Sequence, residues 1–169
     1  CRPSLASGDS GKALGSYAGL AMVFADEATL CDTAFDKVPA TFNLAQNIAQ
    51  PTPMYTVASP QLLALRQALE ENYADPGSRA RRFAHYCSLG TWVRTTLRRR
   101  GIPVLVDDET AAPVICTFPL PNRQFARRCA DLGFQIAHES GYLEERGWGQ
   151  ISVMGDLTEQ AIEGVFDAM

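Results

Sequence analysis

The chain of 169 residues carries 46% hydrophobic and 20% charged residues, with a formal net charge of −4 at neutral pH. This composition is typical of a globular protein with one ordinary core or two small ones, and the negative charge argues against a general binder of nucleic acid or membrane surfaces. No apolar run reaches the roughly 18–20 residues of a membrane-spanning helix, so neither nucleic acid nor membrane is expected as a partner.

The first third of the chain has few regular elements. Residues 7–18 are rich in glycine and serine around Lys12 and predict a turn, and residues 19–26 predict a short buried strand. Residues 26–35 predict a short helix or turn. Residues 36–60 contain four prolines and lack any hydrophobic period, which indicates a functional loop or a segment packed against another chain.

Two helices are expected next. Ser59 is a candidate N-cap and Pro60 suits the first turn of a helix that ends near residues 75–77. Its apolar stripe comprises Leu62, Leu65 and Leu69. A longer helix ends at Gly101, and its apolar positions recur at steps of three and four, at Phe83, Tyr86, Leu89, Val93 and Leu97.

Beyond Gly101 the period changes to that of strands. Strands are expected at residues 102–107, 112–120, 134–140 and 150–156, and helices at 121–133 and 157–169, the last capped by Asp156 or Thr158. This order predicts an α+β domain with a mixed or antiparallel sheet. We place the domain boundary near the long helix, with domains at residues 1–75 and 76–169.

The cysteines and histidines limit the possible chemistry. Five cysteines lie far apart without a CxxC pair, which indicates a reducing compartment, and we expect a cytoplasmic protein. Neither of the two histidines stands near a cysteine at metal-ligand spacing, so no metal site is expected. The chain opens at Cys1 without methionine or leader, and we interpret it as the C-terminal part of a longer protein.

Lys12 is one of only two lysines, the other being Lys37, and it lies in "SGDSGKALGSYAGLAMVFAD" at 7–26. A phosphate-binding P-loop is disfavoured, because Ala6 and Ala13 stand where that motif needs Gly and Ser or Thr, and because no apolar strand leads into it. Two interpretations remain. One is a glycine-rich turn with a solvent-facing lysine, and the other is a lysine that forms a Schiff base with an aldehyde.

The segment around Lys12 resembles the active-site segment of class V, fold-type I, pyridoxal-phosphate aminotransferases. "PMYTVASPQLLALRQAL" at 53–69 and "GFQIAHESGYL…WGQISVMGDLT" at 133–158 resemble two later segments of the same family, in the same order. The pattern is most similar to the 2-aminoethylphosphonate–pyruvate transaminase group. Cysteine desulfurases of this fold usually carry a histidine directly before the lysine, where this chain has Gly11.

The resemblance implies the end of a fold-type I large domain followed by a small α+β domain. It implies that Lys12 carries pyridoxal 5'-phosphate and acts as general base, and that Ser10 and Thr56 bind the cofactor. Because Thr56 would reach the phosphate of the neighbouring subunit, a homodimer is expected. The implied reaction moves an amino group from a small amine or amino acid, such as 2-aminoethylphosphonate, to a keto acid such as pyruvate.

Two departures from the family pattern qualify this interpretation. Gln150 stands where many relatives have the arginine that binds the substrate's acid group, and glutamine cannot form the bidentate ion pair. Arg146 could substitute, and Gln150 could instead only pair within the sheet. In this family the aspartate that pairs with the pyridine nitrogen precedes the lysine by more than the eleven residues that stand before Lys12 here, so these residues alone are expected to be inactive. The alternative is a non-catalytic binding module at 102–169, or a degenerate relative.

Overall fold

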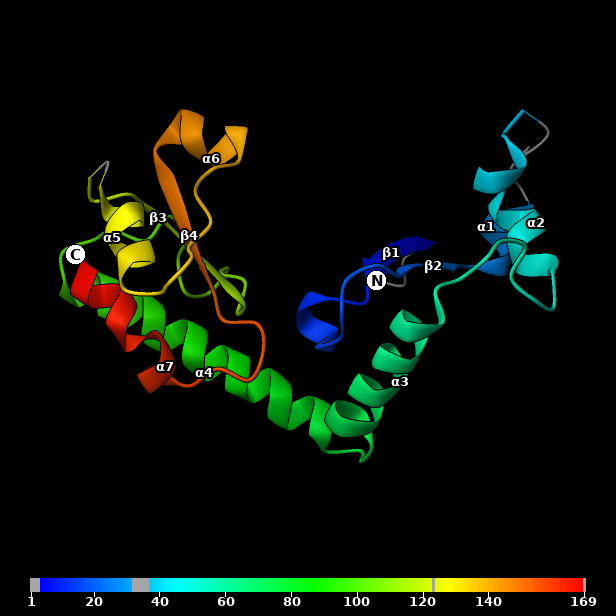
Figure 1. The fold of residues 1–169 in the computed structure, drawn as a ribbon, viewed down its shortest axis with the longest axis horizontal. Helices are drawn as coiled ribbons and strands as arrows, with labels where there is room; N and C mark the ends of the chain where they lie inside the picture. The colour runs from blue at the N-terminus through cyan, green and yellow to red at the C-terminus, as the bar shows by residue number, and fades with distance from the viewer. Residues whose placement is uncertain (1–3, 32–36, 123, 169) are drawn as a thin grey trace. The chain divides into compact units, whose positions relative to one another are not determined.

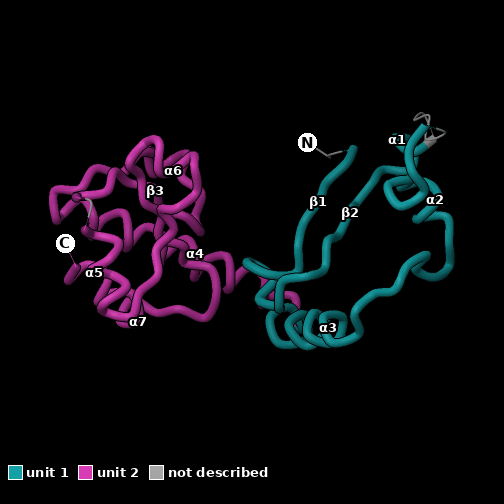
Figure 2. Tube along the Cα trace, turned by 45° about the horizontal axis from the view of Figure 1, so that its top comes forward, with its two compact units in different colours: residues 1–74 teal, residues 75–169 magenta. Residues whose placement is uncertain are grey.

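The computed structural model describes residues 4–31, 37–122 and 124–168. The chain divides into two compact units, Cys1–Ala74 and Asp75–Met169, coloured teal and magenta in Figure 2. Each unit is described by itself below. Their elements are labelled along the chain in Figure 1.

The first unit begins with two antiparallel strands. β1 (Leu5–Asp9) pairs with β2 (Ala21–Ala25), with Leu5 opposite Ala25 and Asp9 opposite Ala21. β2 confirms the strand expected at 19–26, but the expected burial is wrong, because three of its five residues are exposed. β1, which leads into the Lys12 turn, was not expected, but it is an exposed strand rather than the apolar strand of a P-loop, and the P-loop residues are lacking. Its sequence, LASGD, has low strand propensity, so pairing with β2 decides its conformation.

Short helices follow β2. The expected helix after it is α1 (Glu27–Cys31), and residues 32–36 lie outside the described part. Residues 36–60 are less irregular than expected, because they contain the 3₁₀ turn η2 (Ala40–Phe42) and α2 (Leu44–Ala49). The Asn43 side chain caps α2 by accepting a hydrogen bond from the Gln46 amide at 2.9 Å. A local cap thus starts a helix that hydrophobic periodicity does not reveal.

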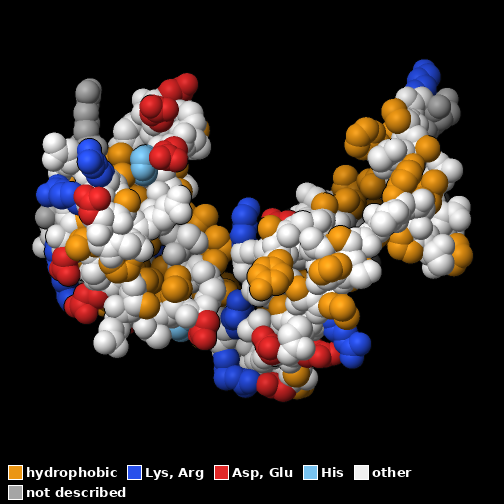
Figure 3. Space-filling view, viewed as in Figure 1, with side chains coloured by type: hydrophobic (Ala, Val, Ile, Leu, Met, Phe, Trp, Pro, Cys, Tyr) orange, Lys and Arg blue, Asp and Glu red, His pale blue; other side chains and the backbone are white. Residues whose placement is uncertain are grey.

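α3 (Ser59–Tyr73) confirms the first expected long helix. Its N-cap is Ala58, so Ser59 is the first helical residue rather than the cap. Leu62 and Leu69 of the expected apolar stripe are exposed. In Figure 3 apolar side chains are spread over the visible face of this unit. Helix periodicity predicts which residues form an apolar stripe, but it does not ensure that another element packs over that stripe.

The second unit is built on α4 (Ser78–Arg99). Tyr86, Leu89, Val93 and Leu97 are buried as the periodicity predicts, whereas Phe83 is exposed. The helix ends at Arg99 with Arg100 as its C-cap, and Gly101 follows directly with a φ of 76° in the left-handed region, as expected for the residue after a C-cap.

In the described residues of this unit the sheet is one antiparallel pair of strands. β3 (Ile115–Pro119) pairs with β4 (Trp148–Ser152), with Cys116 opposite Ile151 and Phe118 opposite Gly149. The strand expected at 134–140 is reduced to one bridge, between Ala137 and Gln150. The strand expected at 102–107 is wrong. That segment donates one backbone bond to β3, from Leu105, and Pro103 in it lacks the N–H that a ladder requires.

Helices complete the second unit. α5 (Phe125–Asp131) and α7 (Glu159–Glu163) fall where helices were expected, the latter followed by the 3₁₀ turn η3 (Gly164–Ala168) and capped by Thr158. α6 (Gly141–Arg146) was not expected. Helices and sheet share one core, which comprises Leu89, Val93, Leu97, Ile102, Cys116, Phe118, Phe125, Cys129, Ile136, Ile151, Val153, Ile162, Val165, Phe166 and Ala168.

Candidate active site

Lys12 opens a 3₁₀ turn, η1 (Lys12–Leu14), at the end of the β1–β2 pair. Its φ is 54°, and among the described residues it is the one non-glycine residue with positive φ. A left-handed backbone costs an L-residue about 1–2 kcal/mol. Strain of this kind, held by the surrounding structure, is concentrated at functional sites in proteins. The conformation therefore distinguishes Lys12 from an ordinary surface lysine.

The amine of Lys12 is accessible. Its side chain is 70% exposed, and Nζ lies 3.6 Å from Oδ2 of Asp9. The other oxygen of Asp9 accepts a hydrogen bond from the Gly11 amide at 2.9 Å. Gly11 is buried, and a Cβ there would lie 3.1 Å from Asp9 Oδ1. Asp9 thus contacts both the backbone of the turn and the amine of Lys12. The sequence analysis did not single out Asp9, although an acidic residue three positions before Lys12 could have suggested this contact.

Ser10 holds the loop that follows the lysine. It is fully buried, and its hydroxyl donates to the Tyr17 carbonyl at 2.6 Å and accepts from the Leu20 amide at 3.2 Å. Its backbone amide also donates to the Leu20 carbonyl. The hydroxyl's one proton is therefore used within the loop. A contact from Ser10 to a phosphate stays a prediction, and it would require the Tyr17 bond to be exchanged.

α3 forms the other wall of this region. The Tyr73 hydroxyl donates to the Ala13 carbonyl at 3.1 Å. Beside the lysine turn is a hollow of about 430 Å³, lined by Gly15, Ser16, Tyr17, Ala64, Gln67, Ala68 and Glu71. The buried Ser16 hydroxyl has no hydrogen-bond partner among the described residues. Thr56 lies in the exposed segment that leads into α3.

Gln150 belongs to the second unit, whereas Lys12, Ser10 and Thr56 belong to the first. Its side-chain amide donates to Thr117 Oγ1 at 3.1 Å, directly across the β3–β4 pair. Its backbone exchanges two hydrogen bonds with Ala137. These contacts are those of a residue that pairs within the sheet, which is the second of the two roles considered for Gln150. A contact between Gln150 and a substrate stays a prediction.

Arg146, the other candidate for binding an acid group, lies on aromatic rings. Its guanidinium carbon is 4.2 Å from the Tyr142 ring centre and 5.4 Å from that of Trp148. The two rings meet edge to face at 5.8 Å. The side chain remains partly exposed. This stacking accounts for the position of Arg146 without any ligand.

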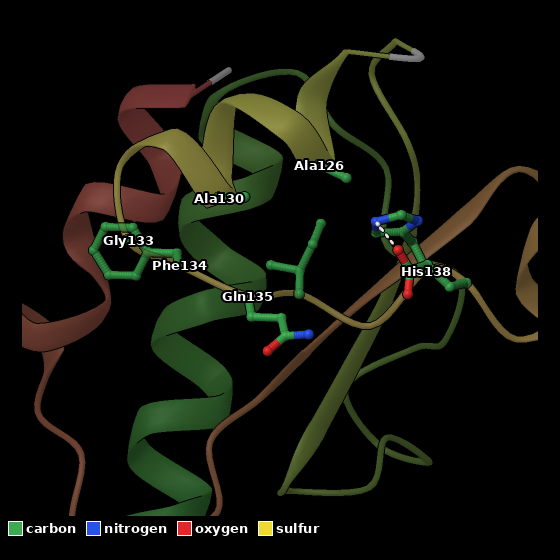
Figure 4. A pocket seen from close by; sticks show the side chains of 8 residues that line it. Ala126, Ala130, Gly133, Phe134, Gln135 and His138 are labelled. Atoms are coloured by element: carbon green, nitrogen blue, oxygen red, sulfur yellow. Dashed lines mark ion pairs between the residues drawn. The ribbon is translucent and has the colours of Figure 1, made fainter.

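Another hollow in the second unit, of about 310 Å³, lies between α5 and residues 133–139 (Figure 4). His138 stands at one side of it, with Nε2 3.9 Å from Glu139 Oε1. Among the described residues no group of three or more His, Cys, Asp or Glu side chains could hold a metal ion. The helices of the described residues are all too short or too polar to cross a membrane.

The described residues have the fold of the C-terminal part of aminotransferase chains, which confirms the expected fold class. An aspartate aminotransferase of subgroup IV from Thermus thermophilus matches 98% of the chain with a TM-score of 0.80 and 20% identity. Ureidoglycine–glyoxylate aminotransferase from Bacillus subtilis matches 98% with a TM-score of 0.79 and 21% identity. Alanine–glyoxylate aminotransferase from Nostoc sp. matches 98% with a TM-score of 0.75 and 18% identity.

The match covers 47%, 45% and 46% of those three chains, so this chain spans about half their length. At 18–21% identity the likeness concerns the fold. No protein-family model matches the chain, and no curated protein matches its sequence.

Proposed function

We propose that this chain is the lysine-bearing part of a pyridoxal-phosphate-dependent aminotransferase of class V. The observation that carries the proposal is the backbone of Lys12, a positive-φ lysine with an exposed amine at the end of an antiparallel strand pair. The fold shared with aminotransferases over 98% of the chain supports it.

The residues around Lys12 fit a flat aldehyde cofactor. Gly8 has open space where a Cβ would stand, and the lack of a Cβ at Gly11 leaves room for Asp9 Oδ1 and Ala18 to lie close to the backbone. Among the described residues the amine makes one ion pair, an exposed contact with Asp9 that is worth little in water and is easily exchanged. When bound, the cofactor would supply an electron sink for the carbon that carries the amino group.

Lys12 would perform two tasks with the same nitrogen. Its Nζ would hold the cofactor at the aldehyde, and as a free amine it would serve as the general base that takes a proton from the donor's carbon. Asp9 would keep the amine beside the turn in the released state. Ser10 would hold the loop rigid, because both polar ends of its hydroxyl are bonded within it.

The substrates and the assembly follow from the resemblance. We propose a homodimer, with Thr56 reaching the cofactor phosphate of the partner subunit, and a cytoplasmic location. The amino donor would be a small amine or amino acid, such as 2-aminoethylphosphonate, and the acceptor a keto acid such as pyruvate. With Gln150 in the acid-binding position, the acid group would receive a neutral hydrogen bond rather than an ion pair.

Borohydride reduction of the complete gene product with pyridoxal phosphate, followed by peptide mapping, tests the proposal. We expect the label on Lys12 and an absorbance band at roughly 410–430 nm before reduction. Lys12→Ala should lose both, while Lys37→Ala, the matched control at the other lysine, should keep both. A colourless protein, or label on Lys37 alone, would contradict the proposal and favour a non-catalytic module.

A further inference from the structure

The turn that carries Lys12 has a backbone conformation that is unfavourable on its own. Lys12 has a φ of 54°, and its carbonyl accepts a hydrogen bond from the Gly15 amide at 2.9 Å, which closes the turn. One turn of this kind fixes several dihedral angles for a single internal bond. Strained residues persist where the surrounding structure determines them, so contacts from outside the turn decide how the amine is presented.

The contacts on the two sides of Lys12 come from different parts of the chain. Ser10 and Asp9, both ahead of Lys12, bond to backbone groups of the same loop. The carbonyl of Ala13, directly after Lys12, accepts instead from the Tyr73 hydroxyl at 3.1 Å. Tyr73 is the last residue of α3 and stands 60 positions from Ala13. Lys12 is thus held on one side by its own loop and on the other by a helix that is distant in sequence.

One face of α3 lies along the lysine turn. The residues of this face that line the hollow beside residues 15–17 recur at steps of three or four, and they comprise Ala64, Gln67, Ala68 and Glu71. Among the described residues of the first unit, Ala68 is the one apolar residue that is buried. Two alanines on this face allow the turn to lie close to the helix, which brings the Tyr73 hydroxyl within bonding distance of the turn.

We propose that Tyr73 is a positioning residue for Lys12. Its hydroxyl holds the carbonyl of Ala13, so the turn keeps the left-handed backbone of Lys12 and presents the amine in one direction. The use of that amine rests on the proposed function, whereas the effect of Tyr73 on the turn does not. Because Tyr73 is only partly buried, the loss of this neutral hydrogen bond should change the local opening equilibrium about two- to fivefold.

Hydrogen exchange measured by NMR on the complete gene product without cofactor tests the effect on the turn. Tyr73→Phe removes the hydroxyl and keeps the ring. The Gly15 amide, which closes the turn, should exchange about two- to fivefold faster in this variant. The Leu20 amide, which is bonded further along the loop, should keep the parent rate, because only a general loss of stability would accelerate both. Tyr55→Phe, whose hydroxyl is bonded elsewhere in the same unit, is the matched control and should leave Gly15 unchanged.

Labelling with pyridoxal phosphate and borohydride tests the effect on the amine. Tyr73→Phe should reach the same final label on Lys12 as the parent, but about two- to fivefold more slowly, because the amine points less often in the reactive direction. The inference is overturned if Tyr73→Phe is labelled at the parent rate, if Gly15 keeps its parent exchange rate, or if Gly15 and Leu20 accelerate equally. A parent that takes no label, with selective acceleration at Gly15 in the variant, would contradict the proposed function and still support Tyr73 as the residue that holds the turn.

Discussion

Gly90 offers the sharpest test of how the second unit is packed. It is a buried residue in the interior of α4, where glycine is normally unfavourable. A Cβ built on it would stand 2.2 Å from the backbone carbonyl oxygen of Pro113, far inside van der Waals contact. The absence of a side chain therefore lets the segment before β3 lie directly against the helix.

Two opposing contributions to the free energy of unfolding decide whether Gly90→Ala stabilises or destabilises the protein. Alanine gains about 1 kcal/mol over glycine in a helix interior. Overpacking costs about 1–3 kcal/mol, and we expect the upper end because the obstacle is backbone rather than a rotatable side chain. The expected result is a net loss of about 1–2 kcal/mol, which lowers the urea midpoint by roughly 0.5–1 M at a slope near 2 kcal/mol/M.

Tryptophan fluorescence during urea unfolding measures this loss in the correct unit. The chain has two tryptophans, Trp92 and Trp148, and both belong to the second unit. Gly141→Ala is the matched control, because Gly141 is helical and no atom lies within 4 Å of its Cβ position. That variant should be neutral or slightly more stable. If Gly90→Ala were as stable as the parent, the inferred contact with Pro113 would be wrong.

Three further predictions concern single residues. Lys12→Gly should stabilise the first unit by about 1 kcal/mol, because glycine accepts a positive φ, and hydrogen exchange of β1 and β2 measures this gain. The same substitution should abolish the cofactor label. The hydrogen bonds from Arg98 and Arg94 lower the pKa of Asp108 in the folded state. The stabilisation that they give is therefore present above the unfolded pKa near ~3.9 and is lost as the pH falls through the lower pKa of the folded state. Asp108→Asn should be less stable at neutral pH, and its unfolding free energy should depend less on pH below about 4, as followed by tryptophan fluorescence. Gln150→Ala should lower the unfolding free energy by about 0.5–1.5 kcal/mol, and this loss should vanish when Thr117→Val has already removed the partner. The same substitution should raise KM less than about tenfold. A larger increase in KM without a loss of stability would assign Gln150 to substrate binding instead.

The sequence by itself determined the long helices, β2, and the helical segments that close the chain. These elements rest on local signals: the repeat of Tyr86, Leu89, Val93 and Leu97 along α4, and the Thr158 cap of α7. Such signals lie within a few residues, so they can be read without knowing what packs where. The sequence also singled out Lys12, by its glycine-rich neighbours and by the resemblance of its segment to a known family.

Only the tertiary structure decided which weak segments became strands and what each site residue touches. β1 exists because β2 pairs with it, whereas residues 102–107 have strand-like side chains but only one backbone bond to β3. The positive φ of Lys12 and the bonds of the Ser10 hydroxyl depend on the closure of the loop back to Leu20. The burial of Arg94 and its ion pair with Asp108 depend on a contact between residues that are 14 positions apart in the sequence. Pairing, strain and burial are properties of the packed chain, and local patterns do not encode them.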